Sequence, residues 1–177
     1  FRGGSGIFDM AVFKARLKNA FQLREIDFDS HVKFLPHLSP EQYQALNALG
    51  DVALDTPEWS GGNTTLEALY QNIPVVTLPG DKMRACVSAG ILRVVGEEET
   101  IATDVDDFIE IAARLGKEPS LRGRVSEKIA ANRSKLETDM SCMRAMETFF
   151  ENAVKFPGHF LRSCKLCSSR AIGLRHS

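Results

Sequence analysis

The segment DVALDTPEWSGGNTTLEALYQNIPVVTLPG, residues 51–80, gives the clearest indication of the fold. It holds two apolar runs, at 51–55 and 73–79, and the second is rich in the β-branched residues that suit a buried parallel strand. Between them lie the glycine-rich turn SGGNTT, residues 60–65, and the helical pattern TTLEALYQN, residues 64–72. Strand, helix and strand in close succession predict an α/β fold with a parallel sheet that is covered by helices.

Helices are also predicted before this segment. Residues 10–25 carry apolar residues at helical spacing with Lys and Arg between them. Residues 31–36, HVKFLP, are typical of a short strand that ends at a proline. Residues 38–51 predict another helix, because Ser39 and Gln42 have the spacing of a capping box.

Helical patterns dominate after the segment. Residues 81–96 predict a helix that Gly96 closes, and residues 100–104, TIATD, predict one more short strand. From Val105 onward the apolar residues recur only at helical spacing, so we expect helices that pack on the sheet.

The composition fits one ordinary globular core, since 44% of the 177 residues are hydrophobic and 25% are charged. We expect one Rossmann-like lobe over residues 1–156 and an irregular tail over residues 157–177. Because residue 1 is Phe rather than Met, we expect this chain to be a fragment of a longer protein. In the tail, Cys164 and Cys167 form CKLC without a second pair at zinc-ribbon spacing, so we predict no metal site.

The charges, the apolar runs and the cysteines indicate which partners and which cellular compartment to expect. The 22 Lys and Arg nearly cancel the 23 Asp and Glu, so no overall field favours nucleic acid. No apolar run approaches the roughly 20 residues that cross a bilayer. The 4 Cys are irregularly placed, which favours free thiols in a reducing compartment. We therefore expect a cytoplasmic protein with no nucleic-acid or membrane partner.

The glycine-rich turn is the candidate functional feature. A loop that leaves the carboxyl end of a parallel strand and opens a helix presents unpaired N–H groups and the positive end of the helix dipole, which suits an anion. We expect Gly61 and Gly62 to let a phosphate approach the backbone and to permit positive φ, and Asn63, Thr64 and Thr65 to offer hydrogen-bonding side chains. The same turn also starts helices in ordinary α/β proteins, and its spacing matches neither the Rossmann nor the P-loop fingerprint.

A longer string carries a resemblance to a known family. WSGGNTTLEAL, residues 59–69, followed by PVVTLPG, residues 74–80, resembles the C-terminal catalytic half of the O-GlcNAc transferase and SPINDLY-like glycosyltransferases, especially bacterial members with tetratricopeptide repeats. The resemblance spans residues 13–154. It implies the C-terminal, donor-binding lobe of a GT-B enzyme, incomplete at its N-terminus, that transfers a sugar from a nucleotide-sugar to Ser or Thr of a protein.

The resemblance also implies roles for individual residues. The candidate nucleotide-binding residues are Gly61, Gly62, Asn63, Thr64, Thr65, Glu67, Tyr43 and Arg84. The residues from Gly62 to Thr65 would face the diphosphate, Glu67 would bind the ribose and Tyr43 would stack on the base. Arg84 is a further cation for the diphosphate or, equally, a solvated helix residue.

Departures from the family leave several points open. Pro40 and Tyr43 stand where O-GlcNAc transferases use a Lys and a His, so UDP-GlcNAc and GDP-fucose both remain donors to test. The family's candidate catalytic His lies outside this chain, so we assign no catalytic residue and expect this chain alone to be inactive. The resemblance also implies that no metal is needed, with the helix N-terminus and the hydroxyl donors stabilising the leaving diphosphate instead. Protein acceptors would bind the missing N-terminal lobe and repeats.

Two alternatives to a donor lobe remain from the sequence. One is a non-catalytic α/β interaction module left by truncation or divergence. The other is a GT-B enzyme that acts on a small molecule or a lipid-linked sugar.

Overall fold

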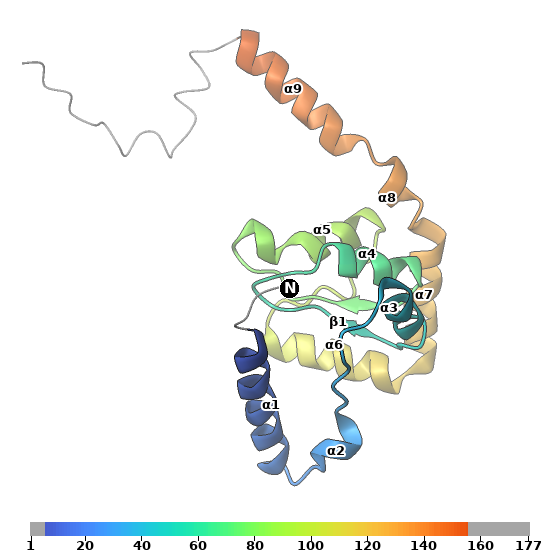
Figure 1. Ribbon diagram of the computed structural model, residues 1–177. Helices are drawn as coiled ribbons and strands as arrows, with labels where there is room; N and C mark the ends of the chain where they lie inside the picture. The colour runs from blue at the N-terminus through green and yellow to red at the C-terminus, as the bar shows by residue number, and fades with distance from the viewer. Residues whose placement is uncertain (1–5, 156–177) are drawn as a thin grey trace, which may run out of the picture. The chain divides into compact units, whose positions relative to one another are not determined.

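The computed structural model describes residues 6–155 (Figure 1). The chain divides into two compact units, Phe1–Tyr43 and Gln44–Ser177. The predicted boundaries of a single lobe over residues 1–156 stay a prediction, and the predicted tail at 157–177, with Cys164 and Cys167, lies outside the described residues.

Aromatic rings hold the first unit together. It contains α1 (Gly6–Gln22), which confirms the predicted helix, and α2 (Phe28–His31). The ring of Phe28, a buried residue, lies edge-on to that of Phe21 with 5.5 Å between centroids. Phe34 extends this cluster, because its ring centroid lies 6.4 Å from that of Phe28.

The predicted strand at residues 31–36 is wrong. The Asp27 side chain accepts a hydrogen bond from Ser30 N at 3.1 Å, which favours the helical turn of α2 through His31. Val32 does adopt extended backbone, with φ −125° and ψ 125°. Within residues 6–155, however, the only strand ladder joins β1 to β2, so this extended segment pairs with no strand.

The capping box at the start of α3 (Pro40–Asn47) is confirmed. Ser39 N donates to Gln42 Oε1 at 2.9 Å, and Gln42 N donates to Ser39 Oγ at 3.3 Å. The boundary between the two units falls inside this helix, after Tyr43.

The second unit is built on two parallel strands, β1 (Ala53–Leu54) and β2 (Val75–Val76), with Ala53 opposite Val75. Helix α4 (Asn63–Tyr70) connects them, which confirms the predicted order of strand, helix and strand. A single parallel bridge joins Thr77 to Ile101, at the place where another short strand was predicted.

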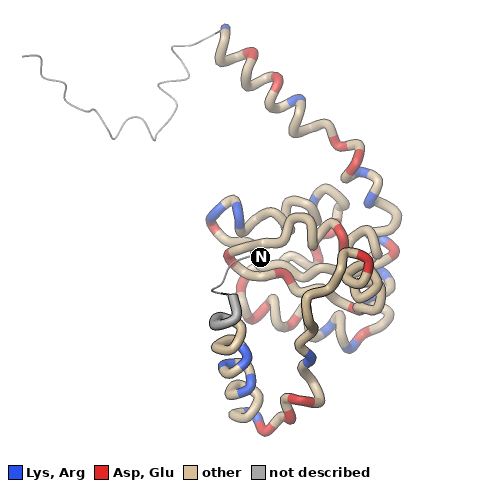
Figure 2. Tube along the Cα trace, viewed as in Figure 1, with Lys and Arg blue, Asp and Glu red and all other residues tan. Residues whose placement is uncertain are grey.

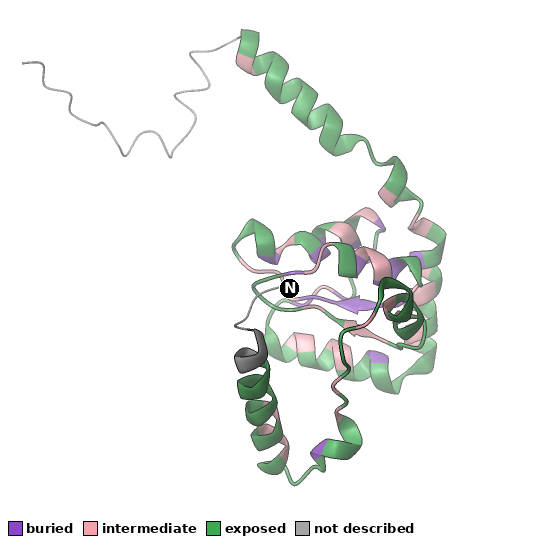
Figure 3. Cartoon of the chain, viewed as in Figure 1, coloured by how far each residue is buried: buried purple, intermediate pink, exposed green. Residues whose placement is uncertain are grey.

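The helices that follow β2 are η1 (Met83–Ala85), α5 (Val87–Val94), α6 (Val105–Lys117) and α7 (Pro119–Asn132). Helices α4 and α6 contact β2, while α5 and α7 pack against α4. Gly96, at φ +73°, follows α5 as predicted, because glycine adopts that backbone conformation without a steric penalty. The buried core takes residues from β2, from the connection that precedes it and from α4 to α7: Ala68, Leu69, Ile73, Val75, Val76, Leu92, Leu115, Val125 and Ile129. Buried segments are purple in Figure 3.

The last two described helices are α8 (Lys135–Thr138) and α9 (Ser141–Lys155). Neither contains a buried residue. The prediction that the C-terminal helices pack on the sheet is confirmed for α6, which contacts β2, whereas α7 joins the core by packing against α4 and α6.

The charges of α6 are separated along the helix (Figure 2): Asp106 and Asp107 lie in its first turn, and Arg114 and Lys117 lie in its last. Among residues 6–155, no helix combines the length and the apolar character that a membrane-spanning segment requires.

Candidate functional site

The glycine-rich loop runs from the carboxyl end of β1 to the start of α4 (Figure 1), as the sequence predicts. Gly62 is the N-cap residue and has no side chain with which to cap the helix. The first N–H groups of α4 therefore receive no side-chain cap from this residue. Asn63 and Thr64, which begin the helix, are both exposed. This end of α4 is open to an anion.

The expected positive φ at the two loop glycines is wrong. Gly62 has φ −110°, and in the described part of the chain the glycine with positive φ is Gly96. Gly61 is required for a different reason. A Cβ at this position would lie 2.5 Å from Thr64 Oγ1 and 2.8 Å from Thr65 Oγ1, which is closer than real Cβ contacts. A side chain at Gly61 therefore requires Thr64 and Thr65 to shift.

The carboxylate of Asp55 organises the loop. Its Oδ1 accepts a hydrogen bond from Gly61 N at 2.7 Å. Its Oδ2 accepts from Ser60 Oγ at 2.8 Å and from Thr77 Oγ1 at 2.7 Å. Asp55 thus connects the loop to the residue that follows β2.

Ser88, in the first turn of α5, holds the loop from the other side. Ser88 N donates to Ser60 Oγ at 2.8 Å, and Ser88 Oγ donates to the carbonyl oxygen of Gly61 at 3.0 Å. The hydroxyls of Ser88 and Thr65 lie 2.7 Å apart, and both residues are buried. The Thr65 hydroxyl is therefore used inside the protein, unlike the exposed side chains of Asn63 and Thr64.

Sequence reasoning missed Asp55 and Ser88. A carboxylate at the carboxyl end of a predicted strand, six residues before a glycine, was a signal for Asp55. Ser88 gave no such signal, because it lies 27 residues from Gly61 in an ordinary helical pattern.

Arg84 lies next to the loop. Its Nε donates to the carbonyl oxygen of Glu58 at 3.3 Å, and its guanidinium carbon lies 5.5 Å from the centroid of the Trp59 ring. Its own carbonyl oxygen accepts from Ser60 N at 2.8 Å. A charged pocket of about 270 Å³ lies here, lined by Glu58, Gly80, Asp81, Lys82, Arg84 and Ala85.

The two remaining candidates differ in their placement. Glu67 is half-buried on α4, four residues after Asn63, so both residues lie on one face of the helix. Tyr43 is half-buried and belongs to the first unit. The loop, α4 and Arg84 all belong to the second unit, so the site described here is built from that unit alone.

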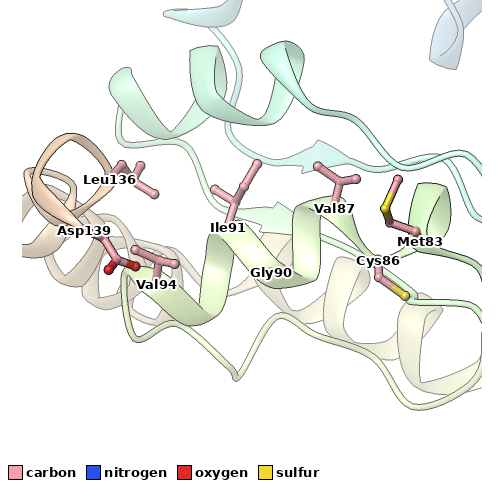
Figure 4. Close-up of a pocket in the computed structure, with 8 residues that line it drawn as sticks. All are labelled: Met83, Cys86, Val87, Gly90, Ile91, Val94, Leu136 and Asp139. Carbon is pink, nitrogen blue, oxygen red and sulfur yellow. The ribbon is translucent and has the colours of Figure 1, made fainter. Parts of the chain in front are cut away.

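A larger groove, of about 400 Å³, lies along α5 and is largely apolar (Figure 4). Its lining residues are Met83, Cys86, Val87, Gly90, Ile91, Val94, Leu136 and Asp139. None of the predicted site residues lines it. Among the described residues, no three His, Cys, Asp or Glu side chains are grouped so that they could hold a metal ion.

This chain is similar to known glycosyltransferases in both sequence and fold. Residues 11–144 match the profile of glycosyl transferase family 41. A solved structure of a Thermobaculum terrenum O-GlcNAc transferase mutant is 30% identical, with a TM-score of 0.66 over 78% of this chain and 27% of that one. This similarity confirms the predicted fold class, the α/β fold of a GT-B glycosyltransferase.

Two curated relatives are named as peptide N-acetylglucosaminyltransferases. The probable UDP-N-acetylglucosamine–peptide N-acetylglucosaminyltransferase SPINDLY of Solanum lycopersicum is 33% identical over 81 residues, 46% of this chain. The UDP-N-acetylglucosamine–peptide N-acetylglucosaminyltransferase of Caenorhabditis elegans is 28% identical over 100 residues, 56% of this chain. The matched region covers 9% of the length of each relative. These similarities confirm the predicted resemblance to O-GlcNAc transferase and SPINDLY-like proteins.

Proposed function

We propose that this chain, which belongs to glycosyl transferase family 41, is the nucleotide-sugar-binding part of a protein O-glycosyltransferase. The whole enzyme would transfer GlcNAc or a related sugar to Ser or Thr of proteins. One observation carries the proposal: α4 begins in a tightly packed glycine loop and leaves its N-terminus, Asn63 and Thr64 exposed. The names of the relatives, both peptide N-acetylglucosaminyltransferases, favour UDP-GlcNAc over GDP-fucose as the donor.

Each candidate residue has a role in this proposal. The diphosphate binds the N-terminus of α4, where Gly62 lets it approach the backbone and Asn63 and Thr64 donate hydrogen bonds. Thr65 supports the loop from beneath, since its hydroxyl lies 2.7 Å from that of Ser88. Glu67 accepts hydrogen bonds from the ribose hydroxyls.

Two further candidates would complete the donor site. Arg84 supplies a positive charge beside the loop, held by Glu58 and Trp59. Tyr43 is the candidate residue that stacks on the base. In this proposal no metal ion takes part, because the helix N-terminus and the hydroxyl donors stabilise the charge that develops on the leaving diphosphate.

The proposal extends to the whole protein only through the family. We propose a cytoplasmic protein with tetratricopeptide repeats, in which regions other than the described residues supply the catalytic base and bind the acceptor protein. The support is the resemblance to bacterial members and the small share of each relative that this chain matches.

Calorimetric titration of the 177-residue chain with UDP, GDP, UDP-GlcNAc and GDP-fucose tests the proposal. We expect binding of the uridine ligands, weakened about tenfold by Thr64→Ala and by Glu67→Ala, because each removes a hydrogen bond to a charged or polar ligand group. Thr138→Ala and Glu127→Ala, exposed positions on α8 and α7, serve as matched controls and should leave binding unchanged. A folded chain that binds none of the four ligands at millimolar concentration contradicts the proposal and favours an interaction module.

A further inference from the structure

We propose that Asp55 is a positioning residue, which acts through Ser60 and Gly61 to hold the N-terminus of α4 in its ligand-binding orientation. The inference rests on the proposed function of the loop and adds a residue that neither the family match nor the sequence motif assigns. Asp55 is half-buried, and its carboxylate accepts two of its three hydrogen bonds from the loop itself.

Both polar groups of the Gly61 backbone are fixed. Its N–H donates to Asp55 Oδ1, and its carbonyl oxygen accepts from Ser88 Oγ. A residue held through both groups cannot rotate freely, so the direction of the chain into Gly62 and α4 is set before a ligand arrives. Such preorganisation raises affinity, because the ligand does not have to order the loop.

The Ser60 hydroxyl links Asp55 to α5. It donates to Asp55 Oδ2 and accepts from Ser88 N, so two hydrogen bonds connect the carboxylate to the first turn of α5. Removal of the Asp55 carboxylate therefore frees the Ser60 side chain and weakens the protection of a buried N–H group at Ser88.

Neutralising the charge of Asp55 distinguishes a positioning role from direct electrostatic repulsion of the ligand. A carboxylate close to a diphosphate repels it, so neutralising Asp55 would strengthen nucleotide binding if charge alone acted. Positioning predicts the opposite sign, since the loop loses the group that holds it. A weaker nucleotide complex after neutralisation therefore shows that the hydrogen bonds of Asp55, rather than its charge, act on binding.

The test compares UDP binding by Asp55→Ala, Asp55→Asn and the wild-type 177-residue chain. We expect Asp55→Ala to weaken UDP binding at least about tenfold, and Asp55→Asn to retain part of the affinity because its amide oxygen still accepts one hydrogen bond. Asp51→Asn is the matched control. It removes the same charge from the other end of β1, where Asp51 is 73% exposed and pairs with Arg122 at 3.2 Å. Its UDP affinity should change less than about twofold.

Hydrogen exchange of the Ser88 N–H provides a readout that needs no ligand. We expect exchange at Ser88 to be at least about tenfold faster in Asp55→Ala, with exchange at Ile129 in the α7 core unchanged. Equal or tighter UDP binding by Asp55→Ala, or unchanged exchange at Ser88, overturns the inference. Absence of UDP binding by the wild-type chain contradicts the proposed function instead, and the exchange at Ser88 then decides on Asp55 alone.

Discussion

Replacing Gly61 with Ala should destabilise the protein, because the loop has no room for a methyl group. The new Cβ would lie 2.5 Å from Thr64 Oγ1 and 2.8 Å from Thr65 Oγ1. Thr64 is exposed and can rotate its hydroxyl away. Thr65 is buried, and rotation of its hydroxyl would break its hydrogen bond with Ser88. The clash with Thr65 is therefore the one that costs free energy.

The magnitude follows from three contributions. Overpacking costs about 1–3 kcal/mol, and loss of the hydrogen bond between Thr65 and Ser88 costs about 1 kcal/mol more. Alanine also restricts the unfolded chain, which offsets this cost by about 0.5–1 kcal/mol. The net loss in the free energy of unfolding is about 1–3.5 kcal/mol, which lowers the melting temperature by roughly 2–14 °C for a domain of this size.

Thermal unfolding followed by circular dichroism measures this effect, and Gly123→Ala is the matched control. Gly123 lies inside α7, and a Cβ there would meet no atom within 4 Å. Because glycine weakens a helix interior, Gly123→Ala should stabilise the protein by about 0.5–1 kcal/mol. If Gly61→Ala melts at or above the wild-type temperature while Gly123→Ala behaves as expected, the close packing of the loop is refuted.

Three further predictions concern the buried hydroxyls, a tyrosine and metal ions. Ser88→Ala should destabilise the protein by about 1–3 kcal/mol, and adding Thr65→Val should cost less than the sum of the two single changes, which a double-mutant cycle in urea measures. The pKa of Tyr70 is raised above its ordinary value of 10.0, because its hydroxyl donates to the Glu137 carboxylate at 2.9 Å. Since folding favours the neutral phenol, this contribution to stability is fully present below pH 10.0 and is lost as pH rises through the folded-state pKa. The variant Tyr43→Phe leaves Tyr70 as the one tyrosine, so its phenolate absorbance reports the pKa of Tyr70 alone. A phenolate transition at or below pH 10.0 would contradict the raised pKa. Excess EDTA should leave UDP affinity unchanged in calorimetry, and a loss of binding that Mg²⁺ restores would show that a metal takes part.

The sequence predicted the elements whose signals are local. The capping box of Ser39 and Gln42 formed as predicted because both partners lie within one helical turn. Gly96 ended its helix for the same kind of reason. The strand predicted at 31–36 failed because a strand also needs a partner, and residue preference alone does not supply one.

The location of the candidate site could be predicted from the sequence, but the contacts that hold its loop could not. The open N-terminus of α4 follows from the order of strand, glycine loop and helix. The role predicted for Gly61 was wrong. A glycine is needed at this position because a Cβ would lie too close to the Oγ1 atoms of Thr64 and Thr65, and not because of the backbone φ. The contact of Ser88 with the loop joins residues far apart in sequence, and such contacts depend on how α5 packs.

Hydrogen–deuterium exchange of the 177-residue chain with and without saturating UDP-GlcNAc tests most directly whether the glycine loop holds the donor. The prediction is slower exchange at the N–H groups of residues 61–67, with α6 and α7 unchanged, because the diphosphate covers the N-terminus of α4. Unchanged exchange at 61–67, or protection confined to the groove along α5 between Met83 and Val94, would contradict the proposal that this loop is the donor site.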